Sequence, residues 1–488
     1  QTFKNIYMKN IQLLLICLLS LYLTGCTEDF EDINDNPNAP QEVSPEFLLT
    51  NVIAAETNEN TYNQGLRLNN YLSQFNADIE FERIDRYELG GNSGYWNLIF
   101  GLLTDLESMK DLPGYNEAYD GVAKIMRSYL FSQLTDMWGD VPYTEAVKFK
   151  ELNFTPAYDT QESIYTDPDT GILATLEAAA AQLQNTSESI SGDIMFGNDL
   201  TKWVRFANSL QVRYRLRISK RVTDFTKLQR LADDNMLMQS NADNAVVPYL
   251  SAAPNQFPLF SASTGIYQGL KMSKTVEEIL KSWDDPRIAV FFNPTPESVL
   301  AGTPEYKGLP NGLSTQTISE RGINLNDLSI MSDRFRAIAD GVDAQIMLYA
   351  EVQFALAEAV ERGFINGDAQ VYYQQGIQAH FEYYGATLPA DYFSREAIAL
   401  NGTQDENLQK ILTQKWLSLF MVGHEAWFNI RRTGIPALTP GPDNFNDDKY
   451  PSRYLYPESE QAANKASYEA AVSRMGGDNI NIKSWWEK

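Results

Sequence analysis

Residues 346–385 read IMLYAEVQFALAEAVERGFINGDAQVYYQQGIQAHFEYYG, and this stretch carries the clearest structural signal in the chain. Apolar residues recur every three or four positions over 346–361, which is the spacing that places them on one face of a helix. Glycines at both ends of 363–367 indicate a turn, and helical periodicity resumes over 369–384 before Gly385, a residue suited to ending a helix. The stretch therefore predicts two antiparallel helices joined by a short turn.

Other segments show the same periodicity. Residues 96–109 and 122–134 predict a second pair, with Pro113 and Gly114 in the connector. Further helices are predicted over 172–183, 200–222 and 408–420. Antiparallel pairs of roughly 34–40 residues are typical of tetratricopeptide repeats, which bury their apolar faces against neighbouring pairs. We therefore predict a mainly α fold whose scaffold consists of tetratricopeptide-like helix pairs.

The sequence changes character between about residues 241 and 320, where eight prolines interrupt short apolar pieces. This segment predicts a loop-rich face with a few short strands, and long loops inside a compact domain are usually functional. No long linker of proline, glycine and serine follows residue 45, so residues 45–488 are expected to form a single domain.

The N-terminal region has the pattern of a lipoprotein signal. Lys4 and Lys9 precede an apolar stretch over 11–23, which is shorter than the roughly 20 residues that span a bilayer. Leu23-Thr24-Gly25-Cys26 then looks like a lipobox. We expect residues 1–25 to be a signal peptide, Cys26 to carry the lipid, including palmitate-type acyl chains, and residues 26–44 to be a flexible leader.

Acidic residues follow Cys26 directly, over 27–32. This run resembles the sorting signal that sends some bacterial lipoproteins to the outer face of the outer membrane. A solvated tether is the alternative. Location on the cell-surface side of the outer membrane is therefore expected.

The chain is strongly acidic, with 64 Asp and Glu residues against 39 Lys and Arg residues and a formal net charge of −25. Such a surface is a poor partner for nucleic acid and for anionic lipid, so membrane contact is expected through the lipid anchor only. The two histidines, His380 and His424, lack a second histidine at metal-ligand spacing, and the sequence contains no nucleotide-binding glycine motif or G-x-S-x-G elbow. We expect no metal, no cofactor and no enzymatic activity, although a glycosidase-type carboxylate pair stays open.

One predicted helix is unusually basic for so acidic a chain. Its cationic residues are Arg205, Arg213, Arg215, Arg217, Lys220 and Arg221. They could form an anion-binding patch, or they could pair with carboxylates of neighbouring helices through their planar guanidinium groups. Pairing is the favoured interpretation.

Several short motifs follow one another along the chain. Residues 136–146 read DMWGDVPYTEA, and residues 349–359 read YAEVQFALAEA. Further motifs are QKW at 414–416, EAW at 425–427, RRTGIP at 431–436, PSRYLYP at 451–457, and Glu460 with Asn464. In this order they resemble the SusD/RagB family of nutrient-binding outer-membrane lipoproteins, which has the turn G-D-V/I-P-Y-T/S-E-A at the first motif and a helix that usually has leucine at the position of Ala355 at the second. The motifs are closest to those of the divergent SusD-like branch.

This resemblance implies four tetratricopeptide-like helix pairs that carry a loop-rich ligand face and sit as a lid over a SusC-like, TonB-dependent transporter. It implies delivery of a nutrient to that transporter, with an oligosaccharide as the favoured ligand. A peptide ligand, an adaptor that binds only the transporter, and a secreted glycoside hydrolase or peptidase remain alternatives. The turn Arg431-Arg432-Thr433 is expected to hold helices together rather than to contact ligand.

A saccharide site needs aromatic faces that stack on the C–H side of a sugar and polar groups that bond its hydroxyls. Aromatic residues at a helix start after a Gly-rich turn, and others around a predicted helix in the proline-rich segment, meet this requirement. The candidates are Asn92, Tyr95, Trp96, Asn97, Tyr267 and Trp283. For each aromatic candidate the alternative is a core anchor, which is the commoner role of such residues.

Overall fold

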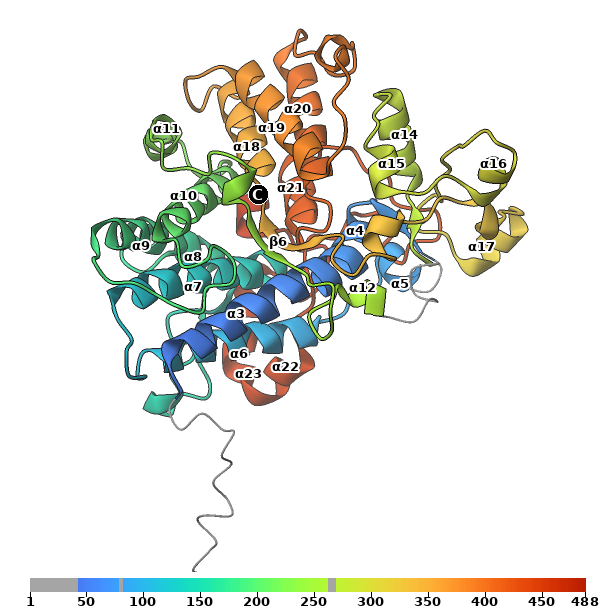
Figure 1. Ribbon diagram of the computed structural model, residues 1–488. Coiled ribbons are helices and arrows are strands. Elements are labelled where there is room, and N and C mark those ends of the chain that lie inside the picture. The colour runs from blue at the N-terminus through green and yellow to red at the C-terminus, as the bar shows by residue number, and fades with distance from the viewer. Residues whose placement is uncertain (1–42, 79–81, 262–268) are drawn as a thin grey trace, which may run out of the picture. The chain divides into compact units, whose positions relative to one another are not determined.

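Helices form most of the computed structural model, which describes residues 43–78, 82–261 and 269–488 (Figure 1). The strands in this part of the chain are β1 (Asn76–Ala77), β2 (Val141–Pro142), β3 (Tyr158–Asp159), β4 (Ala245–Pro248), β5 (Lys271–Met272) and β6 (Asp343–Met347). They pair antiparallel as β1–β5, β2–β3 and β4–β6. The predicted mainly α fold is confirmed. The predicted signal peptide, Cys26, all but two residues of the leader, and Tyr267 lie outside the described residues.

Long helices from the first half of the chain pack in series. They are α3 (Pro45–Glu59), α6 (Ser93–Met109), α7 (Glu117–Trp138), α9 (Ile172–Asn185) and α10 (Leu200–Arg217). Helix α3 packs on α6, α6 on α7, α7 on α9, and α9 on α10. Each helix thus covers the apolar face of the next, as helical repeats require. The pair predicted over 96–109 and 122–134 is confirmed as α6 and α7, whereas the helix predicted over 200–222 ends earlier, at Arg217.

A second group of helices continues the array. It consists of α18 (Tyr349–Glu361), α19 (Ala369–Tyr383), α20 (Gln404–Ser418) and α21 (Glu425–Thr433). Helices α18 and α19 are the pair predicted from residues 346–385, and α18 also packs on α10 and on α20. Helix α18 therefore joins the two groups.

The start of this pair differs from the prediction, because residues 343–347 form strand β6 and the helix begins only at Tyr349. Strand β6 pairs with β4, and it also contacts a π-helix, η1 (Asn60–Asn69). The Asn60 side-chain amide donates to the Gln345 carbonyl at 2.6 Å, and the Gln345 N–H donates to Thr61 Oγ1 at 2.5 Å. These long-range hydrogen bonds hold the backbone extended, and no local sequence pattern reports them.

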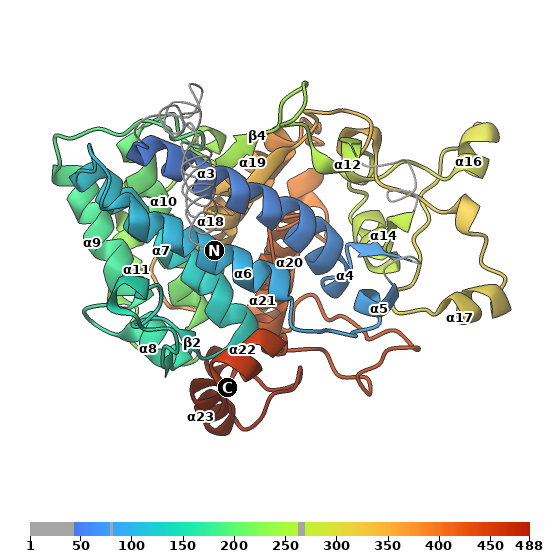
Figure 2. The same ribbon diagram turned by 90° about the horizontal axis from the view of Figure 1, so that it is seen from below.

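Shorter elements complete the described chain. The α-helices are α4 (Asn70–Leu72), α5 (Glu82–Asp85), α8 (Gln161–Thr166), α11 (Thr226–Asp233), α12 (Pro258–Ser261), α14 (Lys274–Ser282), α15 (Ile288–Phe291), α16 (Pro296–Leu300), α17 (Thr315–Glu320), α22 (Glu458–Ala463) and α23 (Lys465–Met475). The 3₁₀-helices are η2 (Phe149–Glu151), η3 (Asn241–Asp243), η4 (Leu325–Asp327), η5 (Asp333–Phe335), η6 (Tyr392–Ser394) and η7 (Trp485–Glu487). Helices α12, α14, α16 and α17 lie together in Figure 2, on the side away from α9. The loop-rich segment with few short strands is thereby confirmed.

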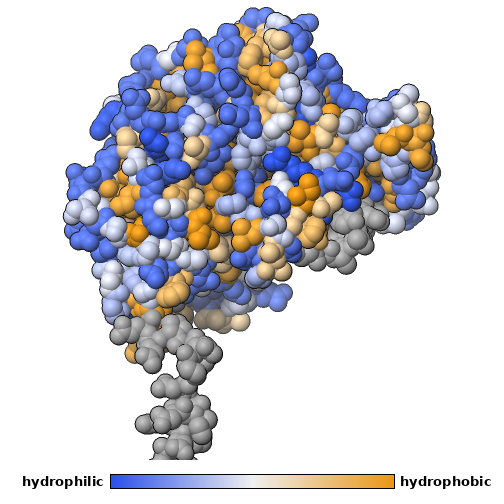
Figure 3. All heavy atoms as spheres, viewed as in Figure 1, coloured by the Kyte–Doolittle hydropathy of each residue, from blue (hydrophilic) through white to orange (hydrophobic). Residues whose placement is uncertain are grey.

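The visible surface is mostly hydrophilic, and its hydrophobic residues form small separated patches (Figure 3). One such patch lies over α16, where Val299 is 52% exposed and Leu300 is 88% exposed. Among the described residues, no helix combines the length and the apolar character that crossing a membrane would require.

Buried ion pairs join the two helix groups. Arg213 of α10 donates from Nε and Nη2 to the two carboxylate oxygens of Glu351 on α18, at 2.7 and 2.6 Å. Arg217, one turn later, lies 2.5 Å from Asp136 Oδ2 of α7 and also bonds Glu425 of α21. All of these side chains are at most 5% exposed. The pairing of these two arginines with carboxylates of neighbouring helices is therefore confirmed.

A second part of this network surrounds Glu358 of α18. Both of its oxygens accept hydrogen bonds from Arg432 of α21 at 2.6 Å, and the Lys415 ammonium of α20 lies 3.7 Å away. Although burial opposes ionisation, Arg432 and Lys415 hold the pKa of Glu358 well below its ordinary value. The adjacent Arg431 bonds Glu487 at 3.0 Å. The expectation that Arg431 and Arg432 hold helices together is confirmed, but the prediction of a turn is wrong, because Arg431-Arg432-Thr433 are the last residues of helix α21.

A different buried carboxyl group lies between α3 and α6. Glu56 is fully buried, its Oε1 accepts a 2.7 Å hydrogen bond from the Tyr95 hydroxyl, and its Oε2 has no hydrogen-bond partner among the described residues. Burial raises the pKa of Glu56 to about 8. The group is therefore a neutral carboxylic acid at pH values well below this.

We expect Glu358→Gln to lower the free energy of unfolding by about 3–5 kcal/mol, because it leaves two cations buried without their counter-charge. Denaturant unfolding followed by tryptophan fluorescence would measure this. Glu469→Gln is the matched control, because Glu469 is 61% exposed in its pair with Lys465, and exposed pairs contribute about 0–1 kcal/mol. Equal effects of the two substitutions would contradict the role assigned to Glu358.

We expect Glu56→Gln to change how stability depends on pH. Because folding raises the pKa of Glu56 from 4.5 to about 8, its contribution is fully present below the unfolded pKa and is lost as the pH rises through the folded one. Relative to the variant, the wild type should lose up to about 1.4 kcal/mol per pH unit in this window. Denaturant unfolding at a series of pH values would measure the difference. A difference that stays constant would show that Glu56 is ionised throughout.

Candidate ligand-binding site

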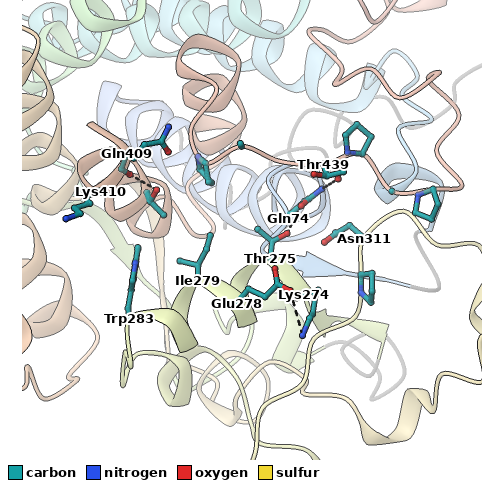
Figure 4. Close-up of a pocket in the computed structure, with 17 residues that line it drawn as sticks. Gln74, Lys274, Thr275, Glu278, Ile279, Trp283, Asn311, Gln409, Lys410 and Thr439 are labelled. Carbon is teal, nitrogen blue, oxygen red and sulfur yellow. Dashed lines mark hydrogen bonds and ion pairs between the residues drawn. The ribbon is translucent and has the colours of Figure 1, made fainter. Parts of the chain in front are cut away.

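A cavity of about 600 Å³ opens between α14 and α20 (Figure 4). We call it the Trp283 cavity. Helix α14 and residues 310–311 form one wall, whereas the middle of α20 and residues 436–442 form the other. Its apolar lining consists of Ile279, Trp283, Pro310, Pro436, Ala437, Pro440 and Pro442.

Trp283 stands at one end of the cavity, directly after the last residue of α14. Ser273 caps the start of the helix, because its hydroxyl accepts a hydrogen bond from the Thr275 N–H at 3.1 Å. Arg395 fixes the other end, because its Nη1 donates to the carbonyl oxygens of Trp283 at 3.0 Å and of Asp284 at 2.7 Å. Trp283 is 7% exposed, so it offers the cavity a limited apolar surface. Its indole N–H bonds no other described residue.

Two backbone segments touch where the walls meet. A Cβ atom on Gly441 would lie 2.1 Å from the Asn311 carbonyl oxygen and 2.4 Å from the Gly312 Cα atom. Gly312 itself has a φ of +65°, in the left-handed region that favours glycine. Glycine at both positions is therefore what allows residues 436–442 to lie against residues 310–313.

A buried carboxyl group holds one of these segments from behind. Asp85 accepts hydrogen bonds from the Asn311 side-chain amide at 2.5 Å and from the Gly312 N–H at 2.9 Å. Burial raises the pKa of Asp85 to about 7, against the opposing effect of these two hydrogen bonds. The wall is thus fixed before any ligand arrives, which reduces the ordering cost of binding.

Several polar side chains of the lining are already bonded to one another. Thr275 Oγ1 donates to Gln74 Oε1 at 2.6 Å, and Gln74 Nε2 donates to the Thr439 carbonyl at 2.8 Å. Lys274 bonds the neighbouring Glu277 at 2.9 Å. Burial disfavours the charge of Glu277, but its hydrogen bonds still hold its pKa below the ordinary value. The two bonds of Gln74 therefore connect α14 with residue 439 on the opposite wall.

Other polar groups are open to a ligand. The Gln409 amide and the Thr439 hydroxyl are exposed, and neither has a bonding partner in the part of the chain that the structure describes. Glu278 lies 4.0 Å from the Lys274 ammonium, which is a loose contact. Amide and hydroxyl groups with free donors and acceptors suit a ligand rich in hydroxyl or amide groups.

Three charged side chains, Lys274, Glu278 and Lys410, are among the described residues that line the cavity. Glu278 is the one carboxylic acid among the described residues that line the cavity, whereas glycosidases use two. Lys410 is engaged, because its ammonium donates to the carbonyl oxygens of Glu396 and Ala399 at 2.9 and 2.7 Å. Across residues 43–78, 82–261 and 269–488, no group of three or more His, Cys, Asp and Glu residues could hold a metal ion.

Two of the predicted aromatic contacts lie inside the scaffold. Tyr95 is 1% exposed and donates its hydroxyl hydrogen bond to Glu56. Trp96 is 3% exposed and packs edge-to-face on Trp138, with ring centroids 5.2 Å apart. Both rings therefore act as core anchors, and neither presents an open face to a sugar in this structure.

The remaining candidates are dispersed. Asn92 directly precedes α6 and has a φ of +45°, and its side-chain amide donates to Gln64 Oε1 at 2.8 Å. Asn97 is exposed on α6. Tyr267 lies outside the described residues. Of the predicted residues that the structure describes, Trp283 alone lines the cavity.

Sequence reasoning did not single out Gln409, Thr439 or the segment 436–442. The segment reads PALTPGP, and this density of proline and glycine was an available signal for a fixed loop. Nothing local indicates that it lies opposite α14.

Comparison with known protein families shows which family the chain belongs to. The chain matches a SusD-like family model over residues 37–457, and the family is described as "Starch-binding associating with outer membrane". The chain therefore belongs to the SusD-like family, as the motifs predicted. No curated protein matches the chain.

Solved structures of SusD homologues share the fold. Two from Bacteroides fragilis are 27% and 26% identical, with TM-scores of 0.78 and 0.80, and cover 92% and 91% of this chain and 100% of each of their own chains. A chitin-binding SusD homologue from Flavobacterium johnsoniae is 26% identical, with a TM-score of 0.77, and the match covers 91% of this chain and 98% of that one. The likeness extends over nearly the whole of each chain.

Proposed function

We propose that this protein is a surface lipoprotein that captures an oligosaccharide in the Trp283 cavity and passes it to a SusC-like, TonB-dependent transporter. The observation that carries the ligand assignment is the cavity itself. Its volume of about 600 Å³ is in the range of roughly 300–1,000 Å³ that small-molecule sites have. Its mixture of proline, indole and free amide groups is the chemistry that sugar rings and hydroxyls need.

Each group has a defined role in this proposal. Trp283 and Ile279 contact the apolar C–H surface of a sugar ring, and the indole N–H donates to one hydroxyl. Gln409 and Thr439 bond further hydroxyls from the opposite wall. The backbone contact between Gly312 and Gly441 fixes the position of the two walls before a ligand binds, so binding does not have to order them.

The comparisons indicate which ligands should be tested first. The family description refers to starch binding, and one similar structure is that of a chitin-binding homologue. Chitin carries an acetamido group on each sugar, and the Gln409 amide is a suitable partner for such a group. Oligosaccharides of starch and of chitin are therefore the leading ligand candidates.

We expect isothermal titration calorimetry to detect binding of one of these oligosaccharides, and Gln409→Ala to weaken it about 3- to 10-fold through loss of one hydrogen bond. Trp283→Phe should weaken it similarly by removing the indole N–H. Gln409 is exposed, so its substitution should leave the unfolding transition unchanged. Trp485→Phe is the matched control, because Trp485 does not line the cavity.

Three outcomes of the titration would contradict the assignment. Binding that is insensitive to both variants would place the site elsewhere. Binding of mixed peptides instead of oligosaccharides would favour a peptide-binding protein, and the same variants would locate that site. Binding of no ligand with or without the transporter present would favour an adaptor that contacts only the transporter.

The membrane anchor is proposed from the sequence. The lipobox-like Leu23-Thr24-Gly25-Cys26 follows an apolar stretch, and two or three acyl chains on Cys26 would hold the protein on a bilayer essentially permanently, because each buried CH₂ contributes about 0.8 kcal/mol. The family association with the outer membrane and the acidic run over 27–32 support the outer membrane and its surface face as the destination.

We expect Cys26→Ser to abolish labelling by radioactive palmitate and to move the protein from the detergent phase to the aqueous phase in cells that process lipoproteins. The thioether bond to the lipid requires the cysteine sulfur, which serine lacks. Thr27→Ser is the control and should keep the label. Unchanged labelling of the Cys26→Ser protein would contradict the proposed anchor.

A further inference from the structure

A second hollow region lies between α9, α10 and α11, which are adjacent in both Figure 1 and Figure 2. It consists of two cavities of about 250 and 320 Å³. Arg215 and Lys227 line both cavities, so the two adjoin each other at these side chains. We call this region the Arg215 groove.

Arg215 differs from the other arginines of α10. Arg205 bonds Asp243 at 3.1 Å, and Arg213 and Arg217 belong to the buried network described above. Arg215 has no ion pair within residues 43–78, 82–261 and 269–488. The pairing that explains the rest of this basic helix therefore leaves Arg215 unexplained.

The guanidinium of Arg215 has unused donors. Its Nη2 donates to Gln211 Oε1 at 3.3 Å, which is a long hydrogen bond, and its Nε is buried with no partner among the described residues. Burial also lowers the pKa of Arg215. A planar cation with free donors, partly removed from water, is suited to binding an oxyanion through paired hydrogen bonds.

The nearby carboxylates are already engaged. Glu177 forms an ion pair with Lys227, with 2.5 Å between the carboxylate oxygen and the ammonium nitrogen. Asp224 accepts hydrogen bonds from the Thr226 N–H at 2.9 Å and from its hydroxyl at 2.6 Å. Both attract Arg215 through space, yet neither forms an ion pair with it.

Other polar side chains also line the Arg215 groove. Arg230 on α11 lines the smaller cavity, is exposed, and forms no ion pair or side-chain hydrogen bond with other described residues. Gln184 at the end of α9 is exposed beside it, and its amide has no bonding partner among the residues that the structure describes. The exposed Asp234 also lines this cavity. Together with Arg215 and Lys227, the smaller cavity contains three cationic side chains against the two carboxylates of Glu177 and Asp234.

We propose that the Arg215 groove binds the carboxylate of an acidic sugar, with Arg215 and Arg230 holding the carboxylate and Gln184 bonding a ring hydroxyl. A uronic acid places its carboxylate and its hydroxyls on one ring, which matches two cations beside an amide. Such a site is distinct from the Trp283 cavity, because its residues come from α9, α10 and α11 instead of α14 and α20. If the groove does not bind an acidic sugar, the proposed function of the Trp283 cavity still stands. If the Trp283 cavity does not bind an oligosaccharide, the proposal for the groove still stands.

The test is calorimetric titration of the full chain, purified with detergent present, with glucuronic and galacturonic acids and with glucose and galactose as neutral partners. We expect at least one uronic acid to bind at least tenfold more tightly than its neutral partner. Arg215→Gln should reduce that affinity at least tenfold, and Arg215→Lys should restore only part of it, because lysine keeps the charge but loses the planar fork.

Two control variants make the result specific. Arg221→Gln makes the same change of charge, but Arg221 stacks on Trp485 and does not line the groove, so binding of the uronic acid should be unchanged. Trp283→Phe should likewise leave it unchanged. The unfolding temperature of Arg215→Gln should not fall, because the substitution removes a partly desolvated charge that has no counter-ion.

Four outcomes would overturn the proposal. They are an absence of uronic acid binding to the wild type, equal affinity for the neutral sugars, equal effects of Arg215→Gln and Arg221→Gln, and a lower unfolding temperature of Arg215→Gln with unchanged affinity. The last of these would make Arg215 a purely structural residue. Acetate that binds as tightly as the uronic acids would overturn the sugar part of the proposal.

Discussion

The buried network of arginines and carboxylates is the constraint on which the rest of the scaffold depends. Taking a charge out of water costs several kcal/mol unless a partner is present at hydrogen-bonding distance. Arg213, Arg217 and Arg432 find such partners only when four helices, α7, α10, α18 and α21, meet in one arrangement. Apolar helix faces alone tolerate many packings, whereas these bidentate contacts tolerate few. The motifs that the sequence shares with the SusD-like family contain much of this network: Asp136, Glu351, Glu358, Lys415, Glu425, Arg431 and Arg432.

Much of the helical scaffold could be predicted from the sequence, because helix formation there depends on local apolar spacing. The pair α18 and α19 and the helices α6, α7, α9, α10 and α20 were all found in this way. The prediction of a helix was wrong for the first residues of 346–361, and the reason is physical. Their backbone is held extended by Asn60 and Thr61, about 285 residues earlier. Apolar spacing carries no information about a partner so far away.

The candidate site was less predictable. Trp283 was named from the sequence, and it lines the cavity, but Tyr95 and Trp96 satisfy the same sequence criterion and are buried. An aromatic residue near a helix end can face inward or outward, and its neighbours along the chain do not decide which. The two walls of the cavity also come from segments that are far apart in the sequence, such as those of Trp283 and Pro436. Their meeting depends on the Gly312–Gly441 contact, whose two glycines look like ordinary loop residues in the sequence.

The position of α21 near the end of the chain has a consequence for the order of folding. Glu358 is synthesised 74 residues before Arg432, and Arg217 is synthesised 208 residues before Glu425. Until α21 exists, closing the scaffold would bury Glu358 without Arg432 and Arg217 without one of its two carboxylates, at a cost comparable to the whole stability of many domains. An emerging chain is therefore expected to stay open until α21 has been synthesised. A chain that ends before α21 would lack Glu425 and Arg432, so it could not complete the ion-pair network and would not close the scaffold.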